Sequence, residues 1–298
     1  MQAPTGVAKM AELAIWRRGD VRAPHKPLLL LLALARRRKG ITDFPYSDCE
    51  PLLAKLLREF GRSARSVHPE YPFWRLQNDG VWIVDTGRPL KTRASNSDPP
   101  RSELRSAGAI GRFTPQICEE FSSNPTLIDT TARQLLDAHF PSSLHEDILC
   151  AVGLPLDLDS PGLRDRRSRD PAFRLAVLQA YAYNCAICGL DLRIGNLTIG
   201  LEAAHIRWYQ ASGPDIVPNG LALCSLHHKL FDYGAVTIDE NSRVLVSEQA
   251  HGTAGFEEHL IRHHGQKLRS TVRPEDKPLS SYTQWHRLQV FKARARPA

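Results

Sequence analysis

Three runs in the C-terminal half decide how it folds: Asn184-Cys-Ala-Ile-Cys188, Leu201-Glu-Ala-Ala-His-Ile206 and Asn219-Gly-Leu-Ala-Leu-Cys-Ser-Leu-His-His-Lys-Leu-Phe-Asp232. They contain two pairs of metal-binding residue types, and two residues separate the members of each pair. Three cysteine thiolates and one histidine imidazole at this spacing are typical of a closed, tetrahedral structural zinc site. The expected zinc ligands are Cys185, Cys188, Cys224 and His227.

The residues around these pairs predict a strand and then a helix. Residues 198–206 are rich in β-forming types and lie between glycine-containing turns, which is typical of a strand. Residues 225–233 contain neither proline nor glycine and are followed by a glycine, so they are predicted to form a helix. Neighbouring helix residues diverge by about 100°, so His227 and His228 cannot share one tetrahedral site. We expect His227 to bind zinc and His228 to face the returning strand and His205 across a small cleft.

The same stretch resembles the HNH nuclease family in its zinc-stapled form, because His205, Asn219 and His228 match the three signature positions in type and order. The resemblance implies a ββα-metal fold and hydrolysis of phosphodiester bonds. His205 would be the general base, Asn219 would brace the loop and orient His205, and His228 would hold a catalytic divalent ion, Mg²⁺ or Mn²⁺. Many members place an acidic metal ligand immediately before the general base. Here that residue is Ala204, so Glu202 is the candidate substitute.

Composition favours a polyanionic partner and excludes several other classes. The 298 residues leave room for two domains, and the formal net charge is +7. The three cysteines outside the expected zinc site are interpreted as reduced thiols, which predicts a cytoplasmic protein. The N-terminus does not resemble a signal peptide. The long apolar run at Pro27–Ala35 is too short to span a bilayer, so no membrane role is expected.

The N-terminal half is predicted to be mainly helical with one small β hairpin. Helical patterns cover residues 7–18, a buried leucine run that begins at Pro27, and residues 49–60, 127–140 and 146–152. The β-rich runs at 71–76 and 81–84 flank Gln-Asn-Asp-Gly, which is a hairpin signal. Residues 157–170 mix both charge signs around a Pro-Gly pair, as linkers do. The overall class is therefore α+β, with a first domain at 1–155, a linker at 156–172 and the HNH domain at 173–298.

A basic segment at residues 86–112 is the predicted phosphate-contacting surface. It contains six cations against Asp98 and Glu103, and serines lie between them.

Three runs in the first domain resemble the sulfur-binding domain of restriction enzymes. They are Arg22–Leu28, Tyr71–Leu76 with the Asp-Gly and Trp82 that follow, and Phe140–His145. The resemblance implies recognition of phosphorothioate DNA, in which sulfur replaces one non-bridging phosphate oxygen. Joined to an HNH domain, the chain resembles a phosphorothioation-dependent type IV restriction endonuclease of the McrA-like kind. Double-stranded DNA carrying this linkage is the expected partner, and a homodimer is a possible assembly.

Sulfur is larger and more weakly hydrated than oxygen, so a shallow apolar cup can favour it over an ordinary phosphate. Phe140, Pro141 and Leu144 are the expected cup, at the break between two helices. Arg93 is expected to contact a guanine edge, because arginine can address that edge with two hydrogen bonds. The expected DNA-backbone contacts are Asn96, Arg101, His25 and Lys26.

Three alternative functions share some of these sequence features. The first is a zinc-stapled DNA-binding protein without hydrolysis, which the complete set of three signature residues disfavours. The second is an HNH nuclease that reads a different DNA modification. The third is a thiol oxidoreductase that uses Cys185 and Cys188, but such motifs usually follow a strand of a βαβ unit, and no such pattern precedes this one.

Overall fold

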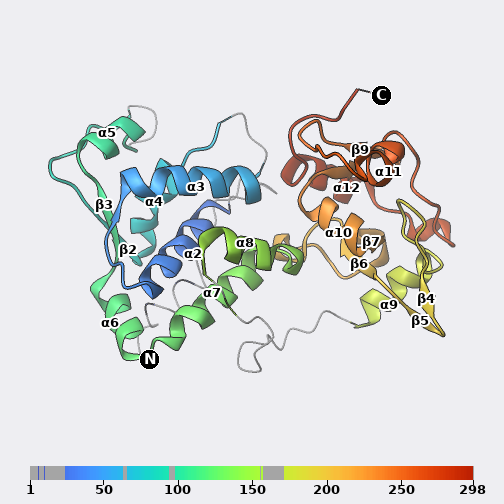
Figure 1. Cartoon of the computed structure of the whole chain (residues 1–298), viewed down its shortest axis with the longest axis horizontal. Coiled ribbons are helices and arrows are strands. Elements are labelled where there is room, and N and C mark those ends of the chain that lie inside the picture. Colours follow the sequence, from blue (N-terminus) through green and yellow to red (C-terminus); the bar gives the residue numbers. More distant parts are fainter. Residues whose placement is uncertain are drawn as a thin grey trace. The chain divides into compact units, whose positions relative to one another are not determined.

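A computed structural model describes residues 6, 10, 24–62, 66–93, 98–154, 156 and 171–297 of this chain. The chain forms two compact units, Met1–Arg164 and Asp165–Ala298, which are described separately (Figure 1). The predicted linker at 156–172 lies outside the described residues apart from positions 156, 171 and 172, and so does the predicted helix at 7–18 apart from Met10. The domain limits given above therefore stay predictions. Across the described ranges, no helix is long and apolar enough to cross a membrane.

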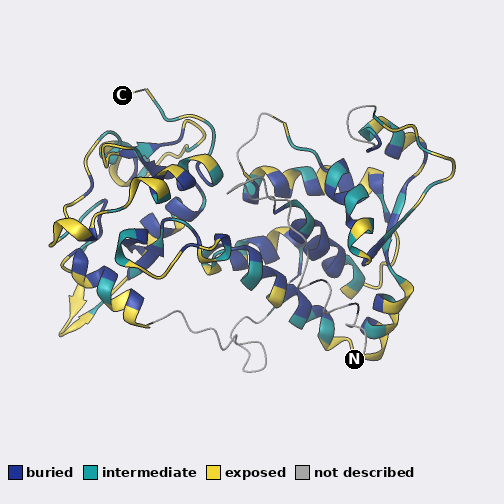
Figure 2. Cartoon of the chain, turned by 180° about the vertical axis from the view of Figure 1, so that it is seen from behind, coloured by how far each residue is buried: buried dark blue, intermediate teal, exposed yellow. Residues whose placement is uncertain are grey.

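The first unit is mainly helical and is built around α2 (His25–Arg38). Residues 27–35 of this helix are buried, as its apolar sequence predicts (Figure 2). It packs against α3 (Tyr46–Phe60), α7 (Thr126–His139) and α8 (His145–Val152), which confirms the helices expected in these regions. The remaining helical elements of this unit are α4 (Glu70–Arg75), α5 (Arg101–Ser106), α6 (Pro115–Ser123) and the short 3-10 helices η1 (Leu76–Asp79) and η2 (Ser142–Leu144).

The predicted hairpin in this unit is wrong. Residues 71–76 form α4 and the start of η1, and Gly80 ends this helical segment with φ of 69°. Pro72 cannot donate to a strand ladder but is tolerated in the first turn of a helix. The three-residue spacing of Phe73 and Leu76 then buries both side chains on one helix face.

A three-stranded sheet takes the place of the hairpin. β3 (Ile110–Phe113) is its centre and pairs antiparallel with both β1 (Phe44–Pro45) and β2 (Trp82–Asp85). The Trp82 ring contacts those of Phe44, Phe73 and Phe113 at centroid distances of 5.5, 5.9 and 5.6 Å. The aromatic residues thus form core rather than a base-stacking surface, as the sequence indicates.

The second unit contains the predicted ββα arrangement (Figure 1). β6 (Leu201–His205) and β7 (Gly220–Cys224) pair antiparallel, so that His205 lies opposite Gly220 and Leu201 opposite Cys224. The expected strand at 198–206 is split in two because Gly200, with φ of 66°, separates β6 from β5 (Leu197–Thr198). The predicted helix is α10 (Ser225–Asp232), and α9 (Pro171–Ala180) also packs against the two strands.

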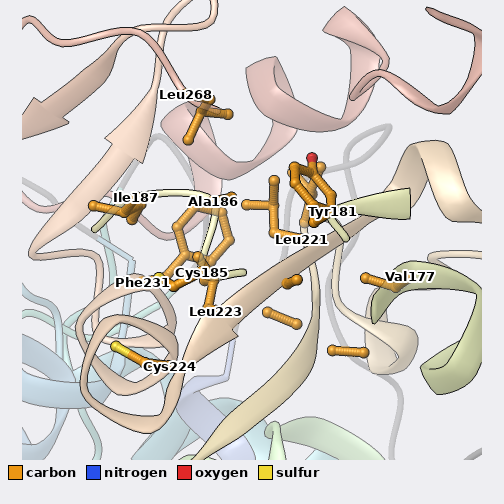
Figure 3. Packing of buried hydrophobic residues seen from close by; sticks show 14 of the residues in the cluster. Val177, Tyr181, Cys185, Ala186, Ile187, Leu221, Leu223, Cys224, Phe231 and Leu268 are labelled. Atoms are coloured by element: carbon orange, nitrogen blue, oxygen red, sulfur yellow. The ribbon is translucent and has the colours of Figure 1, made fainter. Parts of the chain in front are cut away.

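The other elements of this unit surround that hairpin. They are β4 (Arg193–Ile194), β8 (Val236–Ile238), β9 (Val244–Val246), α11 (Phe256–His259), α12 (Ser280–Gln289) and the 3-10 helices η3 (Tyr209–Ala211), η4 (Val217–Asn219), η5 (Ile261–His263) and η6 (Pro274–Asp276). Figure 3 shows Leu221, Leu223 and Phe231 in one buried cluster with Cys185. Two of the expected zinc ligands, Cys185 and Cys224, thus belong to the core of this unit.

Gly111 at the centre of β3 tests the aromatic core. A Cβ at this position would lie 2.2 Å from Trp82 Cζ2 and 3.0 Å from Phe73 Cε2. We expect Gly111→Ala to lower the free energy of unfolding by about 1–3 kcal/mol, because the core must shift to admit the methyl group. Gly87→Ala is the control, since its nearest new contact is an ordinary 3.4 Å to the Ala107 carbonyl oxygen. Equal stability of the two variants in denaturant unfolding would contradict this account of the core.

Candidate functional site

The four expected zinc ligands come together in the second unit. One ligand atom from each of Cys185, Cys188, Cys224 and His227 lies within 4.8 Å of all the others. His227 Nδ1 lies 3.1 Å from Cys224 Sγ and 3.8 Å from Cys185 Sγ, and the Sγ atoms of Cys188 and Cys224 are 4.0 Å apart. Thiolates around one tetrahedral zinc lie roughly 3.8 Å from each other, given bonds of about 2.3 Å. The cluster therefore has the size and donor set of a closed zinc site.

Local structure explains how the chain forms this cluster. The turn that carries Cys185 closes through a hydrogen bond from the Gly189 amide to the Cys185 carbonyl at 2.8 Å, and Gly189 has φ of 79°. Cys224 caps the N-terminus of α10. His227 Nε2 lies 2.9 Å from the His259 carbonyl oxygen, to which it can donate, and this bond leaves Nδ1 facing the thiols.

His228, the next residue on α10, contacts two carboxylates. Its Nδ1 lies 2.5 Å from Glu202 Oε2, and its Nε2 lies 3.2 Å from Asp232 Oδ2. The Glu202 side chain is 42% exposed, whereas that of Asp232 is 2% exposed. Burial by itself lowers the pKa of His228, but Asp232 and Glu202 offset this and raise the pKa to about 9.

This arrangement could hold a divalent ion on the exposed side of the ring. Glu202 and His228 Nδ1 would be ligands there, while Asp232 would accept a hydrogen bond from Nε2 and orient the ring. Sequence reasoning missed Asp232. Its position four residues after His228 places it on the same helix face, and that spacing could have identified it.

His205 has a different set of neighbours. Its ring stacks on Phe173 of α9 with a centroid distance of 4.3 Å, and its Nε2 lies 2.6 Å from Asp215 Oδ1. Glu202 of the same strand instead contacts Ser225 and His228 of α10. The two residues of β6 therefore contact different helices. Asp215 was also missed, and no fixed spacing could have identified it, because it lies in the irregular loop between β6 and β7.

Asn219 ties that loop together. Its side chain is fully buried, and its Oδ1 accepts a hydrogen bond from the Arg207 amide at 2.9 Å. Its Nδ2 donates to the carbonyls of Arg207 at 3.1 Å and Pro214 at 2.9 Å. These bonds brace the loop that carries Asp215. Whether Asn219 also orients His205 stays a prediction.

The structure changes the expected sulfur cup in the first unit. Phe140 is 0% exposed and Leu144 is 2% exposed, because the helix break turns both side chains into the core. Pro141 is half-buried and is the member of this group that reaches the surface. The carbonyl oxygen of Phe140 lies 2.8 Å from Nε2 of the buried His145 and can accept a hydrogen bond from it. Phe140 and Leu144 thus pack in the core beneath the turn between α7 and α8. They do not face solvent, contrary to the expected cup.

The expected DNA-contacting cations are paired within the chain. Lys26 Nζ lies 2.5 Å from Asp79 Oδ2, and both Arg93 and Arg101 contact Glu70. Burial, with smaller contributions from neighbouring cationic groups, lowers the pKa of His25 to about 4, so this ring is uncharged at neutral pH. Asn96 lies outside the described residues.

The count of cations and anions within residues 86–112 therefore overstated the positive charge of this surface. It omitted acidic residues that other parts of the chain bring to the segment. The ion pairs that involve its arginines are Arg88–Glu103, Arg93–Glu70, Arg101–Glu70, Arg105–Glu50, Arg112–Asp43 and Arg112–Asp85.

Two family models match the sequence. Residues 5–157, more than half of the chain, match the model described as ScoMcrA-like, DNA sulfur-binding domain. Residues 185–239 match the HNH endonuclease model, and this range contains the Cys/His cluster and the three signature residues. No curated protein matches the chain.

Several solved structures are similar to the chain. The sulfur-binding domain of ScoMcrA complexed with phosphorothioated DNA is 22% identical with a TM-score of 0.45, over 51% of this chain and 97% of that one. The type IV phosphorothioation-dependent restriction endonuclease ScoMcrA is 22% identical with a TM-score of 0.42, over 50% of this chain and 33% of that one. The modification-dependent TagI restriction endonuclease is 22% identical with a TM-score of 0.29, over 46% and 41%. The matches thus cover nearly all of the isolated domain and less than half of each whole enzyme.

Removing the Asn219 side chain tests the bracing of the site. Asn219→Ala leaves three partly buried backbone groups without their side-chain partner, so we expect the free energy of unfolding to fall by about 1–3 kcal/mol. Asn241→Ala, at an exposed position, is the control and should change stability little. The check is denaturant unfolding together with limited proteolysis of the β6–β7 loop. A loop that resists proteolysis equally in both variants would show that Asn219 does not brace it.

Proposed function

This chain belongs to the ScoMcrA-like DNA sulfur-binding domain family, and from this membership and its HNH site we propose that it is a phosphorothioation-dependent restriction endonuclease. It carries a DNA sulfur-binding domain and an HNH endonuclease domain on one chain. That combination is the observation that carries the proposal. The first domain would bind phosphorothioated double-stranded DNA, and the second would hydrolyse phosphodiester bonds nearby.

The geometry supports a general-base role for His205. Asp215 contacts its Nε2 and would fix the ring orientation while His205 accepts a proton from the attacking water. The water oxygen would bond to phosphorus as the bond from phosphorus to the leaving oxygen breaks. Glu202 and His228 would hold the catalytic ion, with Asp232 behind the ring. That ion, Mg²⁺ or Mn²⁺, would stabilise the negative charge that develops on the phosphate and the leaving oxygen.

We assign zinc to the Cys185, Cys188, Cys224 and His227 cluster, in a structural role. Four protein ligands complete a tetrahedral shell, which leaves no position for water or substrate.

The phosphorothioate sulfur would be recognised at Pro141, in the turn between α7 and α8. Its pyrrolidine ring offers a weakly hydrated contact that suits sulfur better than a charged oxygen. Arg93 would contact a guanine edge, and Arg101, Lys26, His25 and Asn96 would hold the backbone. Lys26, Arg93 and Arg101 each form an ion pair with a carboxylate, so bound DNA must share these cations with the carboxylates or displace the carboxylates.

One HNH site cuts one strand at a time, so cleavage of both strands would use a homodimer or two successive events. The six cysteines all lie within the described residues and form no disulfide there, which suits the reducing cytoplasm.

The zinc assignment is tested by replacing one ligand. We expect Cys188→Ser to lose about one zinc per chain and to destabilise the HNH unit, because metal binding and folding are coupled in such sites. Cys150→Ser is the control, since Cys150 is exposed and lies outside the cluster. Elemental analysis that finds no zinc in active wild-type protein would contradict the assignment.

His205→Ala tests the division between reading and cutting. We expect cleavage of phosphorothioated DNA to fall by about 10²–10⁴-fold, the range typical for loss of a general base. Binding of the same DNA should stay near the wild-type value, because the reader lies in the other domain. Near-normal cleavage by this variant would exclude His205 as the base. Sulfur-specific binding without cleavage by the wild type, at any divalent ion tested, would favour the non-hydrolytic DNA-binding alternative.

A further inference from the structure

A buried carboxylate lies at the centre of the expected DNA-contacting arginines. Glu70 begins α4, and its side chain is only 1% exposed. Its Oε1 lies 3.0 Å from His68 Nδ1 and 3.1 Å from Arg93 Nη2, and its Oε2 accepts a hydrogen bond from Arg101 Nε at 2.8 Å. Glu70 thus contacts one neighbour in its own segment and two arginines more than twenty residues further along the chain.

Arg93 also contacts Tyr71 through its guanidinium group and Asp98 through its backbone amide. Its guanidinium carbon lies 5.2 Å from the ring centroid of Tyr71, and that of Arg75 lies 4.5 Å from the same ring. Arg75 donates to the carboxylate of Asp98, and the Asp98 carbonyl accepts a hydrogen bond from the Arg93 amide at 2.9 Å. Both the guanidinium and the backbone of Arg93 are therefore fixed in one place.

The three partners of Glu70 are partly exposed, although the carboxylate beneath them is not. The exposed fractions are 41% for His68, 27% for Arg93 and 36% for Arg101. An approaching duplex can therefore contact the arginines without touching Glu70. Any effect of Glu70 on DNA binding must act through these neighbours.

The charge of Glu70 opposes that of its partners. Burial by itself raises the pKa of Glu70, but hydrogen bonds from its own backbone and from His68, Arg101 and Arg93 lower it overall. The carboxylate is thus ionised at neutral pH, and two guanidinium groups with one carboxylate leave a single net positive charge. Affinity for ordinary DNA depends on how many phosphates the protein neutralises, so this surface attracts unmodified DNA less than two unpaired arginines would.

We propose that Glu70 is a specificity-determining positioning residue of the DNA reader, which fixes Arg93 and Arg101 and weakens binding to ordinary phosphates, so that stable binding depends on the sulfur contact. This inference rests on the proposed function, because it takes Arg93 and Arg101 as DNA contacts.

The same unit contains a matched control. Glu50 is also buried, and its two carboxylate oxygens accept hydrogen bonds from Arg105 Nε and Nη2 at 2.5 and 2.7 Å. Arg105 lies in the basic segment at 86–112, but neither it nor Glu50 is among the individual DNA contacts proposed above. Glu50→Gln therefore removes a buried carboxylate paired with arginine without changing the Glu70 cluster.

The test compares binding of one duplex, with and without a phosphorothioate in each strand, to the full-length protein across a salt series without added divalent ion. We expect Glu70→Gln to bind the unmodified duplex roughly threefold to tenfold more tightly. Its salt dependence should steepen by up to about one unit, because one more phosphate contact becomes available. The affinity ratio between the two duplexes should fall by about tenfold, whereas Glu50→Gln should keep the wild-type ratio.

The inference is wrong if Glu70→Gln keeps the wild-type ratio, or if both variants change the ratio equally. Glu70→Asp gives a second test if Glu70→Gln does not fold. This variant keeps the charge but shortens the reach, so it should bind modified DNA more weakly and unmodified DNA as the wild type does. Tighter binding of unmodified DNA by Glu70→Asp would overturn the inference. Failure of the wild type to prefer the modified duplex would instead contradict the proposed function.

Discussion

The four-ligand Cys/His cluster is the constraint on which the HNH unit depends. It joins the turn after α9 to the junction of β7 and α10, and two of its cysteines are part of the hydrophobic core. Once His227 is fixed by the cluster, the direction of His228 follows from the helix geometry. The pairing of Leu201 with Cys224 then sets the register of β6, which brings Glu202 to His228. A structural metal site would in this way position a second, exposed site beside it.

Carboxylates contact the proposed functional side chains in both units. Asp215 contacts His205, Asp232 and Glu202 contact His228, and Glu70 contacts the two arginines of the proposed reader. Asp232 and Glu70 are buried beneath the groups that they orient, so substrate would meet the cationic or imidazole partner first. Under the proposed function, buried negative charge would fix residues that act on a polyanion and would limit the attraction of the protein to DNA in general.

The sequence was informative wherever chemistry requires a fixed spacing. Cys185, Cys188, Cys224 and His227 meet as predicted, and β6 and α10 lie within the ranges predicted for a strand and a helix. The hairpin at 71–84 failed because the β-forming aromatic residues there also have the spacing of a buried helix face, and tertiary packing decided between the two.

Tertiary contacts explain the other differences. Glu50 and Glu70 reach the basic segment from distant parts of the sequence, so no count within residues 86–112 could include them. The burial of Phe140 and Leu144 likewise depends on how α7 and α8 pack, which a helix-breaking Phe-Pro pair alone does not specify. Asp215 lies in a loop without regular periodicity, so its contact with His205 could not be predicted from sequence spacing.

The central claim is that sulfur recognition and hydrolysis are coupled on one chain. The most direct measurement is competitive digestion of two plasmids of the same sequence and different length in one tube, with phosphorothioation on only one of them. The account predicts that the wild-type protein, loaded with zinc and supplied with Mg²⁺ or Mn²⁺, cuts the phosphorothioated plasmid and leaves the other intact. Equal cleavage of both plasmids, or cleavage of neither while both are bound equally, would contradict it.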